Sequence, residues 1–128
     1  MEQKKVIETK QENKDDANIS YDKARALERF LRNPFDLAIK AELKKYYKLK
    51  KLVVRAAVEN DKFDLVIDMK TLDGNFKKVA KKGGIELFEM YLPAGEKYIV
   101  KAFRKKMLFF KDSEEKSIVL NDDMEVVF

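Results

Sequence analysis

The spacing of apolar residues changes after Lys51, from a helical repeat to strict alternation. The clearest alternation covers residues 63–70, where every second residue is large and apolar: Phe63, Leu65, Ile67 and Met69. Successive side chains of a strand point to opposite faces, so this segment predicts a half-buried strand. A similar alternation precedes it at Val54, Ala56 and Val58. Because only Asn60-Asp61 and one lysine separate the two runs, we expect them to pair as an antiparallel hairpin.

Five further segments have the composition of short strands: residues 85–92, 98–103, 107–110, 117–120 and 125–128. Turn residues occur between strand segments at Asp73-Gly74-Asn75, Pro93-Ala94-Gly95-Glu96 and Asn121-Asp122-Asp123. About seven short strands with frequent turns predict an antiparallel β-sandwich or barrel over residues 51–128. A parallel sheet is not expected, because no helical crossover separates these strands.

Two helices are predicted before the strands, in residues 19–50. Ser20 can cap a first helix over residues 21–32, which has apolar residues at helical spacing. Asn33 as cap and Pro34 as first residue then predict a second helix that continues to about Tyr47 or Leu49. The predicted fold class is therefore α+β, with a helical hairpin followed by the strands.

Residues 1–18 are almost entirely polar and predict a disordered tail. No apolar run approaches the roughly 18 residues that span a bilayer, so no transmembrane segment is expected. The N-terminus also lacks the apolar region of a secretory signal, although a signal trimmed before Met1 stays an open alternative. The lack of cysteine is compatible with a reducing cytoplasm, which is the favoured compartment.

The chain contains no histidine and no cysteine. This removes thiolate catalysis, disulfides, the commonest general base and the commonest transition-metal ligands. We therefore expect no enzyme activity, no cofactor and no metal site. The paired carboxylates Asp64 and Asp68 and the turn Asn121–Asp123 are interpreted as ordinary solvent-exposed acids, although acid–base work or a hard cation is the alternative.

The positive charge is concentrated in one part of the chain. Residues 21–60 hold eleven Lys or Arg against five acids, whereas residues 61–128 hold thirteen of each. Clustered lysines neutralise phosphates and tyrosines stack on bases, which makes nucleic acid a candidate partner of the segment 37–55. The alternative is a solvated face of a lysine-rich protein. The candidate anion- or nucleic-acid-binding residues are Lys40, Lys44, Lys45, Tyr47, Lys48, Lys51 and Arg55.

A second basic cluster, Lys77, Lys78, Lys81 and Lys82, precedes Gly83-Gly84. Glycines after a basic turn can approach an anion closely, but no phosphate-loop motif is present. A flexible charged loop, or a short helix capped by Gly83, is the favoured interpretation.

The segment Met107-Leu108-Phe109-Phe110 is apolar without alternation, so both faces of a strand there would be apolar. Such a strand is either buried between the sheet and the helices, or exposed as a patch for another protein or a second copy of the chain. These four residues are the candidate partner-binding site.

Residues 91–102, with the sequence YLPAGEKYIVKA, resemble the L-P-x-G-x-Y-x-V-x-A segment of prealbumin-like sandwich modules. Those modules include PEGA and carboxypeptidase-regulatory-like domains, and the likeness extends weakly to residues 117–122. The resemblance implies an immunoglobulin- or prealbumin-like sandwich in which the Pro-Gly turn leads into an edge strand. It also implies a binding or structural module and transfers no functional residues.

Together, these patterns predict a small, soluble, lysine-rich protein that acts through surface contacts. The favoured function is a non-catalytic protein-interaction or assembly module, with a protein partner or a second copy of the chain. The alternative is a nucleic-acid-binding protein that uses the basic segment 37–55.

Overall fold

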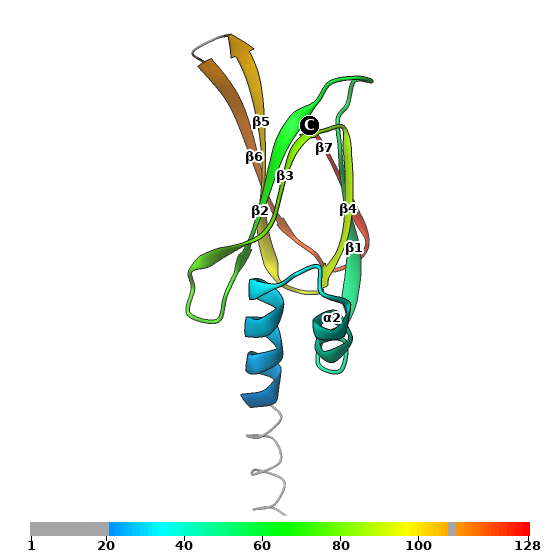
Figure 1. The fold of residues 1–128 in the computed structure, drawn as a ribbon, viewed down its shortest axis with the longest axis vertical. Helices are drawn as coiled ribbons and strands as arrows, with labels where there is room; N and C mark the ends of the chain where they lie inside the picture. The colour runs from blue at the N-terminus through cyan, green and yellow to red at the C-terminus, as the bar shows by residue number, and fades with distance from the viewer. Residues whose placement is uncertain (1–20, 108–109) are drawn as a thin grey trace, which may run out of the picture. The chain divides into compact units, whose positions relative to one another are not determined.

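The computed structural model describes residues 21–107 and 110–128 (Figure 1). The chain divides into two compact units, Met1–Tyr46 and Tyr47–Phe128. Among the described residues, the first unit contains the helices and the second contains the strands. The tail expected over residues 1–18 and the cap expected at Ser20 lie outside the described residues.

Both expected helices are present, and the second is shorter than its sequence pattern predicts. Residues 21–32 are helical, and α2 spans Leu37–Leu43. Asp36, and not Asn33, caps α2: its Oδ1 accepts hydrogen bonds from the N–H groups of Ala38 and Ile39 at 2.9 and 3.1 Å. The prediction of Asn33 as cap is wrong because Asn33 and Asp36 close a turn before the helix.

The second helix ends at Leu43 instead of continuing to Tyr47 or Leu49. The carbonyl of Lys48 accepts a hydrogen bond from the Ala94 N–H at 2.8 Å, and β1 (Leu49–Arg55) begins at the next residue. Backbone groups used in a sheet ladder are not available for a helix, so β1 sets where the helical segment can end. Among the residues of this unit from 21 onward, the buried apolar ones are Ala26, Leu27, Phe30 and Leu43.

The strands form two separate sheets, and the described residues form no closed barrel (Figure 1). The first sheet has the order β4-β1-β7, with β4 at Leu87–Pro93 and β7 at Met124–Val127. The second has the order β3-β2-β5-β6. Its strands are β2 at Phe63–Lys70, β3 at Phe76–Ile85, β5 at Lys97–Met107 and β6 at Phe110–Val119.

Strand pairing is antiparallel except between β1 and β7, which run parallel. The expectation of antiparallel strands agrees with most of this pairing, whereas the parallel β1–β7 pair inside a mixed sheet is not predicted by the sequence. The connection between β1 and β7 contains all the other strands, so the two need no dedicated helical crossover to run in the same direction.

Two expectations about the strands are wrong. β1 does not form a hairpin with β2, because β1 lies between β4 and β7 in the other sheet. The lysine cluster at residues 77–82 is part of β3, not a loop or a helix. It is an edge strand, where lysine side chains can extend into solvent on either side of buried Val79 and Ala80.

The core of this unit lies between the alternating faces of the strands. Leu65, Ile67 and Met69 of β2 and Val100 of β5 are fully buried. The phenol of Tyr98 crosses from β5 to donate a hydrogen bond to the Pro93 carbonyl at the end of β4, at 2.6 Å. Burial, with smaller contributions from Glu96 and Tyr47, raises the pKa of Tyr98 well above its ordinary value. This hydrogen bond ties one sheet to the other at the β4–β5 turn.

Candidate interaction surface

The four-stranded sheet continues on one side as a two-stranded ribbon. The last residue of β5 that pairs with β2 is Phe103, opposite Asp64, whereas pairing between β5 and β6 extends to Met107 and Phe110. In Figure 1, the ends of β5 and β6 project beyond the neighbouring strands. We call residues 104–107 and 110–112, where β5 and β6 pair beyond the end of β2, the β5–β6 ribbon.

The composition of Met107–Phe110 predicts a separate strand. The structure instead places this segment where the chain passes from β5 to β6. Met107 ends β5 and pairs with Phe110, which begins β6. Leu108 and Phe109 lie outside the described residues. The two described ends of the segment therefore lie at the far end of the ribbon.

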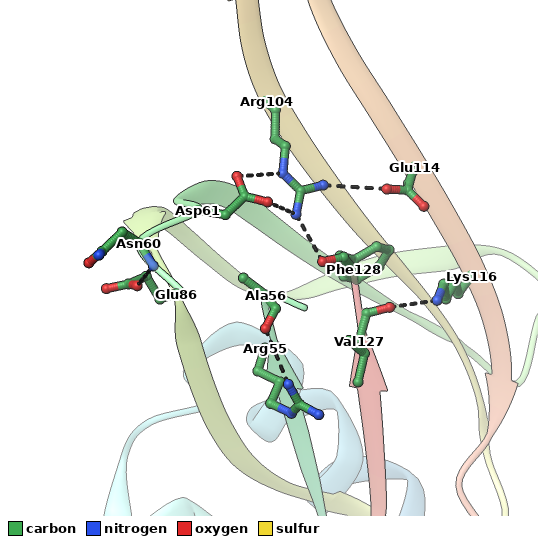
Figure 2. A network of polar contacts seen from close by, with 10 residues as sticks. All are labelled: Arg55, Ala56, Asn60, Asp61, Glu86, Arg104, Glu114, Lys116, Val127 and Phe128. Carbon is green, nitrogen blue, oxygen red and sulfur yellow. Dashed lines mark hydrogen bonds and ion pairs between the residues drawn. The ribbon is translucent and has the colours of Figure 1, made fainter. Parts of the chain in front are cut away.

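Arg104 lies at the base of the ribbon and joins three parts of the chain (Figure 2). Its Nε is 3.1 Å from Asp61 Oδ1, and its Nη2 is 2.8 Å from Asp61 Oδ2. Nη1 is 3.3 Å from Glu114 Oε1 on β6, and Nη2 donates to the carbonyl of Phe128 at 3.0 Å. The guanidinium thus connects the segment before β2, the next strand along the sheet and the residue after β7.

Aromatic rings lie directly beside this network. The guanidinium carbon of Arg104 is 5.6 Å from the centroid of the Phe63 ring, which contacts the Phe128 ring at a centroid distance of 6.0 Å. Lys116 of β6 lies over Phe128 and donates a hydrogen bond to the Val127 carbonyl at 2.6 Å (Figure 2). Side chains of the four-stranded sheet therefore satisfy carbonyls at the end of β7, an edge strand of the other sheet.

No sequence pattern points to Arg104, Asp61 or Lys116, because they come together only through the pairing of distant strands. The one local signal is the placement of Arg104. Within β5 it follows the buried positions Tyr98, Val100 and Ala102 at the same spacing of two, so the alternation places a charged residue on the inner face. A charge at such a position requires a partner, which is Asp61.

The basic segment 37–55 is divided between the two units, with Lys40, Lys44 and Lys45 in the helical unit and the remainder in the sheet unit. Acidic residues from later in the chain lie beside the basic residues of β1. Lys50 pairs with Asp122 at 3.4 Å, Lys51 with Glu89 at 3.6 Å and Arg55 with Glu125 at 2.8 Å. The positive excess seen along the sequence is thus partly neutralised in space.

The other residues of this candidate site differ in their surroundings. Lys45 pairs with Glu42 at 3.3 Å. Lys40, Lys44 and Lys48 form no ion pair within the described part of the chain, and Lys44 and Lys48 are exposed. Burial, followed by the charge of Glu96, raises the pKa of Tyr47. The exposed lysines available to an anion are fewer than the sequence suggests.

The candidate carboxylate pair is engaged in contacts within the sheet. Asp68 pairs with Lys101 of β5 at 3.0 Å, and Asp64 accepts a hydrogen bond from the Gly84 N–H at 2.9 Å. In the turn Asn121–Asp123, Asp122 pairs with Lys50, and Asp123 accepts from the Lys51 N–H at 2.9 Å. Within residues 21–107 and 110–128, no group of three or more acidic residues is arranged to hold a metal ion.

A shallow hollow of about 370 Å³ lies beside Gly83. Its lining includes Val66 of β2, Phe103 of β5 and Lys81 of β3. Gly83 contributes no side chain to the hollow, and a β-carbon there would lie 3.5 Å from Oδ1 of Asp64, another lining residue. Its lining mixes apolar, acidic and basic groups, so it selects no single class of ligand.

Comparison of the chain with protein-family models, with curated proteins and with solved structures found no match. The resemblance of residues 91–122 to prealbumin-like modules therefore stays a prediction. The strand that follows the Pro-Gly turn is β5, which lies inside its sheet and not at an edge. None of the described helices has the length and apolar character needed to cross a membrane.

Proposed function

We propose that the protein is a non-catalytic interaction or assembly module that contacts a protein partner through the far end of the β5–β6 ribbon. The observation that supports this most directly is the continuation of β5 and β6 beyond β2. A two-stranded ribbon has little core of its own and is only marginally stable in isolation. A projecting ribbon that ends in an apolar segment is suited to burial against another protein.

The Arg104 network supports the proposal because it would hold the base of the ribbon in place. Arg104 is the first residue of β5 beyond its pairing with β2, and its side chain is only 19% exposed. Contacts to Asp61, Glu114 and the Phe128 carbonyl restrain both ribbon strands at that point. A ribbon fixed at its base loses less conformational freedom on binding, which favours affinity.

The sequence Met107-Leu108-Phe109-Phe110 supplies the proposed contact chemistry. Binding energy at protein interfaces is concentrated in a few large side chains, among which aromatic residues are enriched. Residues of this kind at the end of a ribbon would form the apolar centre of an interface, and the charged residues along the ribbon would form its rim. A second copy of the chain is one protein partner that this surface could bind.

The proposal can be tested by replacing both described ends of the segment, Met107→Ser with Phe110→Ser. Leu72→Ser is the matched control, because Leu72 is 78% exposed in the turn between β2 and β3. Sedimentation velocity over a range of concentrations would detect self-association, and affinity capture from nuclease-treated native lysate would detect other proteins. We expect the double variant to lose the association and the control to keep it. A monomeric wild type that captures no protein would refute the proposal.

Nucleic-acid binding by the segment 37–55 is the alternative proposal. It is supported by the exposed Lys44 and Lys48 and weakened by the ion pairs of Lys45, Lys51 and Arg55. Its test is a salt titration of binding to single-stranded oligonucleotides, because phosphate contacts make affinity fall steeply with salt. Lys44→Glu with Lys48→Glu should abolish such binding, and a wild type that does not bind at low salt would exclude it.

We also propose that the two sheets belong to the immunoglobulin- or prealbumin-like class of sandwich. The mainly antiparallel pairing and the turn Pro93–Glu96 between the sheets support this assignment. The parallel pairing of β1 with β7 and the internal position of β5 are departures from the pattern that the sequence resemblance implies.

A further inference from the structure

A polar cleft of about 190 Å³ lies within the helical unit. The helix over residues 21–32 lines one side of it with Asp22, Arg25, Ala26 and Arg29. Glu42 of α2, and Tyr46 in the turn after α2, line the rest. All six residues belong to the same compact unit.

The two arginines of the cleft repel each other because they carry like charges on the same face of one helix. Arg25 and Arg29 are four residues apart, so they are neighbours on one face of the helix. Like charges at this spacing destabilise a helix. Arg32 in the same helix has an acidic residue at this spacing instead, and it pairs with Glu28 at 3.7 Å.

Neither arginine of the cleft forms an ion pair with another described residue. Arg25 lies over the Tyr21 ring, with its guanidinium carbon 5.9 Å from the centroid. The carboxylate of Glu42 lines the same cleft but lies 3.3 Å from Lys45 Nζ. Seven basic and four acidic residues in the segment 21–46 leave an excess of three positive charges. The cleft therefore has two guanidinium groups that form no ion pair within the described residues, although Asp22 and Glu42 also line it.

We propose that this cleft binds the phosphate group of a small phosphate monoester, or free phosphate. A guanidinium presents a planar fork of N–H donors that matches phosphate oxygens, and two such forks can share one phosphate. A carboxylate has only two oxygens, which a single fork satisfies. A phosphate monoester has three terminal oxygens and a charge near −2, so it can bind both arginines and accept from the Tyr46 hydroxyl.

The acidic residues of the cleft limit which anions it accepts. Asp22 and Glu42 oppose anions in general, so the proposed recognition depends on the two forks rather than on net charge. This site is independent of the β5–β6 ribbon, because the ribbon belongs to the other unit.

The test is a nuclear magnetic resonance titration of the full chain with three probes: inorganic phosphate, O-phosphoserine and acetate. We expect saturable shifts of the Arg25 and Arg29 side-chain signals with both phosphates in the millimolar range, and at least tenfold weaker binding of acetate. A stronger response to O-phosphoserine than to phosphate would assign the natural ligand to phosphate esters, and the reverse would assign it to free phosphate.

Arg25→Gln and Arg29→Gln should each weaken phosphate binding at least tenfold. Arg32→Gln is the matched control, with the same charge change on the same helix outside the cleft, and it should change binding by less than twofold. Arg25→Lys and Arg29→Lys preserve the charge but remove the fork, and should weaken binding severalfold without loss of folding. No saturable binding by the wild type, or equal weakening by all three Gln variants, would overturn the proposal.

Discussion

The guanidinium of Arg104 contacts both carboxylate oxygens of Asp61, through Nε at 3.1 Å and Nη2 at 2.8 Å. Asp61 lies just before β2 and Arg104 lies where β5 leaves β2, so the pair fixes the chain at the point where the four-stranded sheet narrows to two strands. Both side chains are partly shielded from solvent, with exposures of 35% and 19%. An ion pair between partly shielded side chains contributes more to stability than an ion pair that is fully exposed to solvent.

Arg104→Met should lower the free energy of unfolding by about 2 kcal/mol, because Asp61 and the Phe128 carbonyl lose donors in a partly buried setting. Arg104→Lys keeps the charge but cannot contact both carboxylate oxygens of Asp61 in the same way. Its free energy of unfolding should therefore lie between those of Arg104→Met and the wild type. Urea unfolding measures both. Arg32→Met is the control: its pair with Glu28 is 72% and 62% exposed, so its loss should change stability by less than about 0.5 kcal/mol. Equal effects at the two positions would contradict the assigned role of Arg104.

Truncation of the core of β2 should destabilise the protein more than any surface change. Ile67 is fully buried, so Ile67→Ala should reduce the free energy of unfolding by about 2–5 kcal/mol through lost apolar contact and a residual cavity. Leu72→Ala in the following turn should have an effect below about 0.5 kcal/mol, because Leu72 is exposed. Thermal unfolding of both variants tests whether the alternating apolar residues of β2 point into the core. Similar melting temperatures would mean that the register of β2 is different.

Two glycines of the sheet unit should respond differently to alanine. Gly95, in the turn between β4 and β5, has a φ of +81°, which L-residues rarely adopt. Gly95→Ala should therefore cost about 1 kcal/mol or more. Gly83→Ala meets only Asp64 Oδ1, at an ordinary contact distance of 3.5 Å, and should be neutral or slightly stabilising. Denaturant midpoints compare the two, and a larger loss at Gly83 would refute this account.

The raised pKa of Tyr98 predicts a loss of stability in alkali. Its pKa in the unfolded chain is about 10, and burial raises the folded value, so the folded state holds the proton more tightly. Its contribution is fully present below pH 10 and is lost as the pH rises above that value, with a slope of up to about 1.4 kcal/mol per pH unit. Tyr98→Phe should remove this part of the slope, although it also leaves the Pro93 carbonyl without its donor.

Absorbance at the wavelength of tyrosinate should show Tyr98 ionising at a higher pH in the folded protein than after unfolding, with Tyr47, whose pKa is also raised, shifted in the same direction. Tyr98→Phe with an unchanged slope would contradict the assignment.

The elements that local patterns predicted well are those whose neighbours in sequence decide their structure. The strand at residues 63–70 coincides with β2, because its alternation reflects one buried face. The helix over residues 21–32 is predicted by the helical spacing of Tyr21, Ala24, Leu27 and Leu31, of which Leu27 is buried and Tyr21 is exposed. The expected number of strands agrees with the structure partly because two errors cancel. No sequence pattern predicts β3, and the runs 107–110 and 117–120, each predicted to be a strand, fall at the two ends of β6 and its turn.

The errors occurred where distant segments decide the outcome. β3 contains four lysines within ten residues and resembles a loop, but its exposed edge position accommodates them. The hairpin predicted between β1 and β2 fails because β1 has a stronger set of partners in β4 and β7. The neutralisation of Lys51 and Arg55 by Glu89 and Glu125 depends on the same pairing. No window of sequence around residue 55 contains that information.

The position of β1 also has a consequence for the order of folding. The hairpins β2–β3 and β5–β6 join strands that are consecutive in the chain, so they require only short loops to close. β1 does not pair with a strand that is consecutive in the chain. Its partner β4 follows β2 and β3, and its other partner β7 is the last strand of the chain. Loop-closure entropy makes such pairings slow relative to local ones. We therefore expect the three-stranded sheet to assemble last, on a preformed four-stranded sheet, and its completion to set the folding rate of this unit.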